Sequence, residues 1–321
     1  MRSTLITLLT LLILSPTTTP GWAQENAAVA LDALFQEVWE RDLRENPTQA
    51  SNYGDLRYND RWPDLSPAAM RARNEANEAA LEALLDIPRD ELPPRDRVNY
   101  ELFHRMLENR ISIWRFGREH LYQNSYDTPR NQREGIHTAY ELAEQLSFGD
   151  EQSYRDWIAR LEAYGTYMDQ TIVLYRQSIA DRIVPPKIII ERIRDQVLTL
   201  FSTDPTASPF YNPFRDMPAD MPEPLKAELR AAGRAAITDV VIPAARRYGK
   251  FLTEQYLTAG RDTFGTLYEP DGKAFYADRV KYFTTTDMTQ AEIHRLGLEE
   301  VERIRGEMQA IIDELEFEGD F

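Results

Sequence analysis

The stretch "TTTDMTQAEIHRLGLEEVERIRGEM", residues 284–308, is the most strongly patterned part of the chain. Thr289 and Glu292 have the spacing of a capping box, in which each side chain binds the backbone N–H of the other residue. Apolar residues then recur every three or four positions: Ile293, Leu296, Val301, Ile304, Met308, Ile311, Ile312 and Leu315. This period predicts one amphipathic helix, about 40 Å long, with a buried apolar stripe.

Gly297 and His294 are the two unusual residues of this helix. Glycine inside a helix costs about 1 kcal/mol relative to alanine, so we expect another helix to approach closely at Gly297. His294 lies beside the stripe and is one of four histidines. Two interpretations of His294 stay open: a structural histidine at the boundary of the core, or one that points into a substrate cleft.

Helical periodicity continues through most of the chain and predicts an all-α protein of long amphipathic helices. The first of these helices would have Val29, Val38 and Trp39 on its apolar side and would end before Asn46-Pro47. The predicted helices cover about 29–43, 66–86, 96–114, 135–147, 150–179, 187–201, 225–259 with a bend at Pro243, 273–283 and 289 onward.

Two long polar stretches are predicted to be loops. The segment 46–67 follows the first helix, and the proline-rich segment 202–224 precedes the helix that begins near residue 225. Neither a repeat nor a clear domain boundary divides the chain, so residues 24–321 are interpreted as one helical unit.

The N-terminus has the features of a secretory signal peptide over residues 1–23. Arg2 precedes an apolar run from 5 to 14, and Gly21-Trp22-Ala23 supplies small residues at the positions that a cut after Ala23 requires. A retained signal anchor is the alternative. The chain contains no cysteine, so no lipid attachment is expected. We expect export to the periplasm or medium and no integral membrane span once the signal is removed.

Charge and composition exclude several classes of function. The net charge is −16, and it would be −17 without Arg2. So acidic a protein repels nucleic acids and anionic membranes, and neither is expected as a partner. The absence of cysteine excludes thiolate catalysis within this chain.

The histidines give no metal motif. His104, His120, His137 and His294 are never four residues apart, so no HExxH pair exists, and we predict no metal site and no cofactor in this chain. Neither a nucleophile elbow nor a glycine-rich phosphate loop is present. The catalytic residues are therefore not identified.

Two loops carry side chains suited to binding an extended, peptide-like chain. Tyr126, Arg130 and Asn131 lie in the segment 122–131, and Tyr211 lies in "SPFYNPF", residues 208–214. Aromatic and amide groups on loops beside a helical scaffold favour recognition of a ligand. The alternative is ordinary turn chemistry and local packing. With His294, these residues form the predicted substrate-binding set.

The chain resembles the bacterial family named domain of unknown function 885. The resemblance is carried by "PTQASNYGDLRYNDRWPDLSP" (47–67), "DRVNYELF" (96–103), "SPFYNPF" (208–214) and the segment 284–308. Members of this family are similar to helical zinc metallopeptidases, are about twice this length and carry their zinc motif in the C-terminal half. The resemblance implies that this chain is an N-terminal part, one wall of a metallopeptidase-like helical cleft, with zinc bound in the complete protein.

Three functions follow as hypotheses. The first is an exported zinc-metallopeptidase-like hydrolase of peptides, of which this chain is the N-terminal part. The second is a non-catalytic helical protein of the cell envelope that binds a peptide or a glycan. The third is a structural remnant without activity. The sequence leaves the oligomeric state open.

Overall fold

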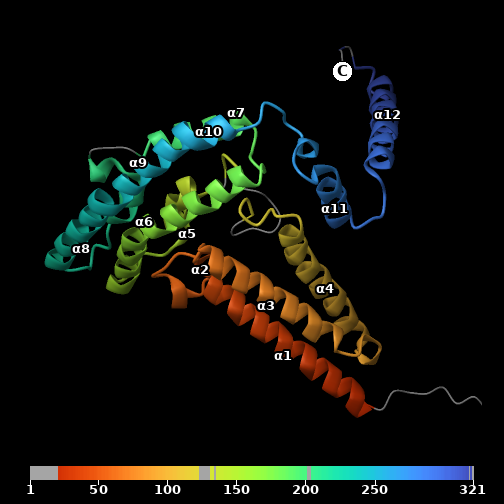
Figure 1. Cartoon of the computed structure of the whole chain (residues 1–321), viewed down its shortest axis with the longest axis horizontal. Coiled ribbons are helices and arrows are strands. Elements are labelled where there is room, and N and C mark those ends of the chain that lie inside the picture. The colour runs from red at the N-terminus through yellow and green to blue at the C-terminus, as the bar shows by residue number, and fades with distance from the viewer. Residues whose placement is uncertain (1–20, 123–130, 134, 201–203, 318, 320–321) are drawn as a thin grey trace, which may run out of the picture.

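The computed structural model describes residues 21–122, 131–133, 135–200, 204–317 and 319. These residues form helices joined by loops, and no strand occurs among them (Figure 1), which confirms the predicted all-α class. The α-helices are α1 (Gly21–Glu45), α2 (Pro47–Asn52), α3 (Pro67–Leu85), α4 (Pro94–Arg115), α5 (Leu142–Gln145), α6 (Glu151–Ala180), α7 (Lys187–Leu198), α8 (Glu223–Ala236), α9 (Ile242–Phe251), α10 (Leu257–Ala259), α11 (Gly272–Thr284) and α12 (Gln290–Glu314).

Helices α1, α3 and α4 pack together at the N-terminal end. Ser66 caps α3, its hydroxyl accepting a hydrogen bond from Ala69 N at 3.3 Å, and Pro67 occupies the first helical position, where no N–H is needed. The three helices share an apolar cluster that includes the fully buried Leu84 and Leu107. This cluster holds α1 against the other two helices (Figure 1).

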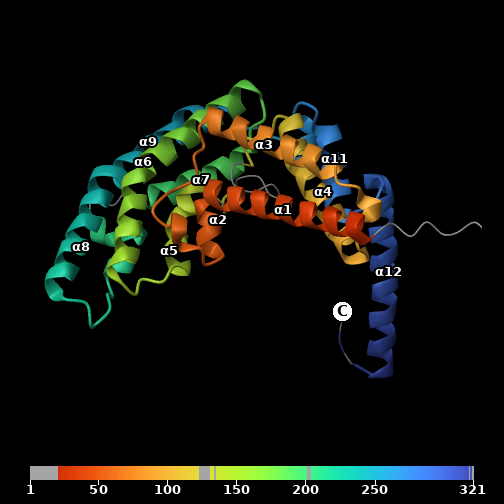
Figure 2. The ribbon, with the colours of Figure 1, turned by 90° about the horizontal axis from the view of Figure 1, so that it is seen from below.

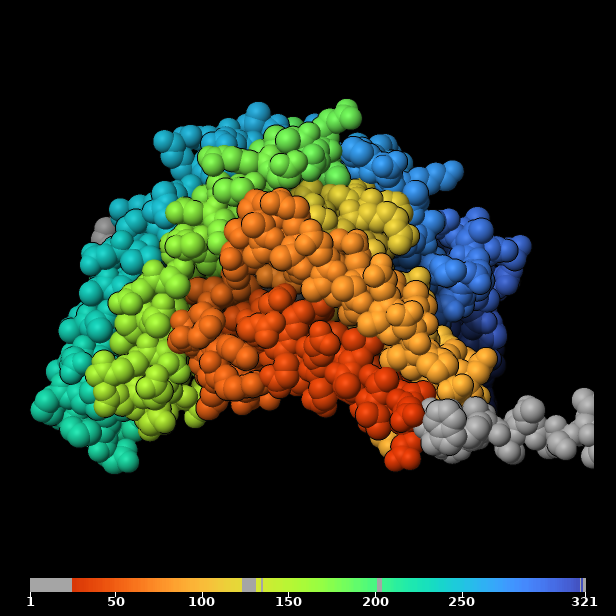
Figure 3. All heavy atoms as spheres, turned by 60° about the horizontal axis from the view of Figure 1, so that its bottom comes forward, coloured from red at the N-terminus to blue at the C-terminus, as the bar shows by residue number. Residues whose placement is uncertain are grey.

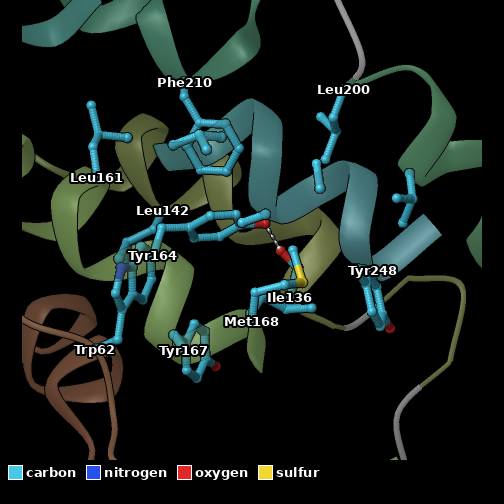
Figure 4. Packing of buried hydrophobic residues seen from close by; sticks show 14 of the residues in the cluster. Trp62, Ile136, Leu142, Leu161, Tyr164, Tyr167, Met168, Leu200, Phe210 and Tyr248 are labelled. Atoms are coloured by element: carbon cyan, nitrogen blue, oxygen red, sulfur yellow. Dashed lines mark hydrogen bonds between the residues drawn. The ribbon is translucent and has the colours of Figure 1, made fainter. Parts of the chain in front are cut away.

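Helix α6 is the centre of the larger core. Asp150, where the predicted helix begins, caps it, with its carboxylate accepting from Ser153 N at 2.9 Å. Its apolar side meets α8 and α9, and aromatic rings fill the space between them. Figure 4 shows Tyr164 of α6 among these rings, where its hydroxyl donates to Ile136 O at 2.8 Å. The only polar atom of this buried side chain is therefore satisfied.

The segment from α8 to α10 is one long helix with two π-helical interruptions, Ile237–Val241 and Leu252–Tyr256. The first lies directly before Pro243, where the sequence predicts a bend. Proline has no N–H to donate to the preceding turn, and a change to wider helical turns accommodates that loss.

The two predicted loops contain short helices that the sequence does not reveal. The segment 46–67 forms α2 and a 3₁₀ turn at Leu56–Tyr58, and the segment 202–224 forms 3₁₀ turns at Pro205–Ala207 and Pro209–Phe214. Prolines and turn-forming side chains dominate both segments, and tertiary contacts fix their short helical turns.

Helix α12 forms as predicted but is not buried. Both halves of its capping box are present: Thr289 N donates to Glu292 Oε2 at 2.7 Å, and Glu292 N donates to Thr289 Oγ1 at 3.3 Å. The predicted burial of its stripe is wrong for this chain, since α12 has no buried residue and nothing lies within 4 Å of a Cβ built at Gly297. The reason is that α12 stands apart from the other described helices (Figures 1 and 2).

Candidate functional site

Helices α1 and α2 lie on the inner side of an arch between the α6–α8 end and α12 (Figure 2), and residues of both helices line a cavity. Figure 3 shows the arched outline below α1. We name this cavity the α1–α4 groove; its volume is about 750 Å³. Its lining comes from α1, α2, α3, α4 and α11: Phe35, Gln36, Val38, Trp39, Asp42, Leu43, Glu45, Asn46, Gln49, Tyr53, Arg73, Phe103, Met106, Asn109, Arg110 and Tyr282.

Aromatic rings form one wall of the α1–α4 groove. Trp39 of α1 stacks on Tyr53, which follows α2, with ring centroids 5.2 Å apart and planes 30° apart. Both residues stay accessible, at 46 % and 60 % exposure. Deeper in the wall, Phe35 meets Phe103 edge to face at 4.8 Å. Such exposed, mutually supported rings offer a flat apolar surface to a ligand.

Ion pairs fix the charged residues of the groove. Arg110 Nη2 lies 2.7 Å from Asp42 Oδ2, and Arg73 Nε lies 3.2 Å from Glu45 Oε2. The carboxylate side chains are 30 % and 29 % exposed, whereas the two arginine side chains are only 13 % and 14 % exposed. The groove therefore presents its negative groups to solvent more than its positive ones.

A buried arginine of α6 holds the segment that carries Tyr53. Arg160 is fully buried and donates to Ser51 Oγ at 2.7 Å, to Arg61 O at 3.1 Å and to Tyr58 O at 3.2 Å. Burial lowers the pKa of Arg160 to about 10, so the side chain is still protonated at neutral pH. Its guanidinium also lies 5.4 Å from the ring centre of Trp62. The guanidinium of Arg160 thus holds the segment between α2 and α3 by hydrogen bonds.

The far side of the groove is closed by α11. Arg279 donates to Asn109 Oδ1 at 2.5 Å, and Ser112 donates to Asp278 Oδ2 at 2.7 Å, which ties α11 to α4. Tyr282, one turn further along α11, lines the groove and lies within cation–π distance of Arg279 at 5.1 Å. These bonds preform the groove in the absence of a ligand.

The substrate-binding residues predicted from the sequence lie elsewhere. Tyr126 and Arg130 fall outside the described residues. Asn131 is half-buried and accepts a hydrogen bond from Arg133 N at 2.8 Å, a local turn contact. Tyr211 is only 6 % exposed, and its hydroxyl lies 3.2 Å from Arg234 Nη1. His294 is exposed on α12, and none of these three described residues lines the α1–α4 groove.

The sequence interpretation missed the groove because it placed Trp39 in the packed face of the first helix. In the structure Leu31, Leu34 and Val38 are buried, while Trp39 is turned to the groove. The missed signal is the spacing from Trp39 to Asp42 and Glu45, which places an aromatic ring and two carboxylates on one helical face.

The described residues do not fit a zinc ion. In these parts of the chain, no three histidine, aspartate or glutamate side chains come together in an arrangement that could hold a metal. His104 lies beside Glu108 on α4, with Nδ1 3.8 Å from Oε2, whereas His120 and His137 are buried. No catalytic step can be assigned to a metal from these residues.

Within the residues that the structure describes, no helix is both long enough and apolar enough to cross a membrane. No curated protein matches the sequence. Among solved structures, the fold is similar to "the crystal structure of the putative lipoprotein from Colwellia psychrerythraea", with a TM-score of 0.78 and 19 % sequence identity. The match covers 92 % of this chain and 52 % of the other, so this chain spans about half the length of that protein.

The sequence itself matches one family profile, described as "Bacterial protein of unknown function (DUF885)", over residues 47–321. The matched region begins at α2 and contains α12. It also contains the segment between α2 and α3 that Arg160 holds, and the groove residues Tyr53, Arg73 and those of α4. Because this match covers most of the sequence, the chain belongs to the bacterial DUF885 family.

Proposed function

We propose that the α1–α4 groove binds an extended peptide, and that the chain is the substrate-binding wall of an exported, metallopeptidase-like hydrolase. The observation that carries the proposal is one preformed cavity in which the accessible Trp39–Tyr53 pair lies beside the carboxylates of Asp42 and Glu45. Its volume of about 750 Å³ is within the range of sites that bind small ligands or a few residues of a chain.

The lining suits both the side chains and the backbone of a peptide. Side chains of a peptide would pack on the aromatic rings, while Gln36 and Gln49, which also line the groove, carry amide groups that can both donate to and accept from a peptide backbone. The wall is held by ion pairs and by Arg160, so little ordering entropy would be lost on binding.

The hydrolytic part of the proposal is supported by the resemblance to zinc metallopeptidases and not by a catalytic group in the groove. The described residues do not form a metal site. A protein of similar fold has a chain about twice as long, which leaves room for a second wall that would carry the reacting groups. Zinc is accordingly proposed for the complete family protein only.

Export is part of the same proposal. Arg2, the short apolar run and the Gly21-Trp22-Ala23 site support cleavage after Ala23, and these residues lie at or before the beginning of α1. The similarity to a protein described as a lipoprotein supports a place outside the cytoplasm. N-terminal sequencing of protein from the producing cells should begin at Gln24.

A non-catalytic binding protein is the second candidate, and one observation favours it. The stacked rings of Trp39 and Tyr53, flanked by amides, also suit the apolar face and the hydroxyls of a sugar. In that case the ligand would be a glycan of the cell envelope and no bond would be cleaved.

Titration calorimetry with an acetylated, amidated alanine-rich hexapeptide and with chitotriose separates these functions. The peptide should bind, and Trp39→Ala should weaken it. Binding of chitotriose alone would support the glycan candidate and overturn the peptide proposal. For the hydrolytic part, this chain should hold no stoichiometric zinc by elemental analysis, whereas a full-length member of the family should hold zinc and cleave the peptide. A zinc-free, inactive full-length member would refute that part.

A further inference from the structure

We infer that the α1–α4 groove selects peptides that carry a lysine or arginine side chain. This inference rests on the proposed function and names the class of substrate that the same groove prefers. The cationic group would lie against Glu45 and Asp42, and the aliphatic stem would lie along the rings of Trp39 and Tyr53.

The arginines of the groove already hold acceptors within the protein. Arg73 donates to Glu45 Oε2 at 3.2 Å, to Asp64 O at 2.9 Å and to Met70 Sδ at 3.2 Å. The guanidinium groups of Arg73 and Arg110 are therefore poorly placed to attract an anionic ligand. Each arginine is also less exposed than the carboxylate with which it pairs.

The carboxylates of the groove can still accept a hydrogen bond from another donor. A carboxylate has about four lone-pair sites. Glu45 Oε2 accepts from Arg73, whereas Glu45 Oε1 lies 4.0 Å from the exposed Arg44, beyond hydrogen-bond distance. Asp42 is more fully used, since it accepts from both Arg41 and Arg110. Glu45 is thus the main anionic residue open to a ligand.

The aromatic rings of the groove suit the stem of a basic side chain. Trp39 precedes Asp42 by three residues and Glu45 by six on α1, so all three lie along one helical face. A lysine or arginine side chain has an apolar stem and a charged end, and aromatic rings attract such a cation. The acidic chain, with a net charge of −16, also favours the approach of a basic peptide.

The test compares three acetylated, amidated hexapeptides that are identical except for one position, occupied by lysine, norleucine or glutamate. Norleucine keeps the stem of lysine and lacks the charge. Titration calorimetry with the whole chain should give about fivefold tighter binding of the lysine peptide than of the norleucine peptide, and the weakest binding for glutamate. Chemical-shift changes at the indole N–H of Trp39, assigned with Trp39→Phe, should accompany binding.

Two variants of α1 provide the matched comparison. Glu45→Gln should reduce the preference for lysine over norleucine to near one, whereas Glu37→Gln, which removes the same charge from an exposed position outside the groove lining, should leave it unchanged. Trp39→Leu, at a half-exposed site, should weaken the lysine peptide two- to fivefold even if Glu45→Gln proves unstable.

The outcomes separate the inference from the function on which it rests. Equal binding of the lysine and norleucine peptides would overturn the inference and leave peptide binding intact. If Glu37→Gln and Glu45→Gln lost the preference for lysine over norleucine equally, the inference would also be overturned, because the net charge of the protein would then be the cause. Failure of all three peptides to bind would refute both the inference and the proposed function.

Discussion

Replacement of Arg160 by methionine tests whether one buried cation holds the turn between α2 and α3. Arg160 is fully buried on α6, and its guanidinium donates to oxygens of Ser51, Arg61, Tyr58 and Pro47 and to no carboxylate among the described residues. Methionine fills a similar volume without a donor, so the substitution removes the hydrogen bonds while largely keeping the packing.

The expected size of the effect follows from two opposing contributions. Three hydrogen bonds of 2.7–3.2 Å from a charged donor contribute about 2 kcal/mol each, about 6 kcal/mol together. Burial of the charge opposes this: it lowers the pKa of Arg160 from its usual value to about 10, which corresponds to about 3 kcal/mol at 1.36 kcal/mol per unit. Arg160→Met should therefore lower the free energy of unfolding by about 3 kcal/mol.

Urea unfolding of the whole chain, followed by tryptophan fluorescence, measures this loss; the melting temperature should fall by roughly 4–5 °C. Arg155→Met is the matched control on the same helix, since that side chain is 45 % exposed and solvent screens its pairs with Glu151 and Glu228, so its loss should change stability little. Arg160→Lys should not restore stability, because one ammonium cannot reach the separate carbonyl oxygens.

Hydrogen exchange supplies the local part of the same test. The amides of residues 47–62 should lose protection in Arg160→Met more than those of α8, because the cation holds this turn directly. If Arg160→Met is as stable as Arg155→Met, the assignment of the turn to this one cation is refuted.

Three further results are expected. Gly272→Ala should destabilise the fold by about 3 kcal/mol, because a Cβ there would lie 1.8 Å from Thr266 O, whereas Gly149→Ala, with open space around it, should change the melting temperature little. Burial raises the pKa of Tyr122 to about 12, so the unfolded chain ionises first. Stability should therefore fall as pH rises from about 10 to 12, by about 3 kcal/mol from this residue; urea midpoints at pH 9, 10 and 11 that did not decline would contradict this. Gly297→Ala should stabilise α12 of this chain by about 1 kcal/mol, seen as slower amide exchange in α12, and faster exchange would show that a close contact exists at Gly297 after all.

Local sequence signals were sufficient for the long helices, though not for the short helical turns of the segments 46–67 and 202–224. The cap at Thr289 and the helix starts near Ser66 and Asp150 lie where the sequence predicts them, because each cap depends on a side chain and a backbone N–H three residues apart. Apolar periodicity predicted the all-α class because it, too, depends on residues three or four positions apart. It did not predict whether a stripe is covered, since α12 has the period of a buried helix and yet is exposed in this chain.

The α1–α4 groove was not predictable, because it brings together residues that are distant in sequence. Arg73 pairs with Glu45 across 28 positions, Arg110 with Asp42 across 68, and Tyr282 closes the groove from α11. The burial of Tyr211, which the sequence offered as a ligand-binding residue, likewise depends on Arg234 of α8. The sequence by itself determined which segments form the long helices, because those interactions span one turn. The packing of the helices alone decided which side chains share a cavity, because that depends on contacts between elements.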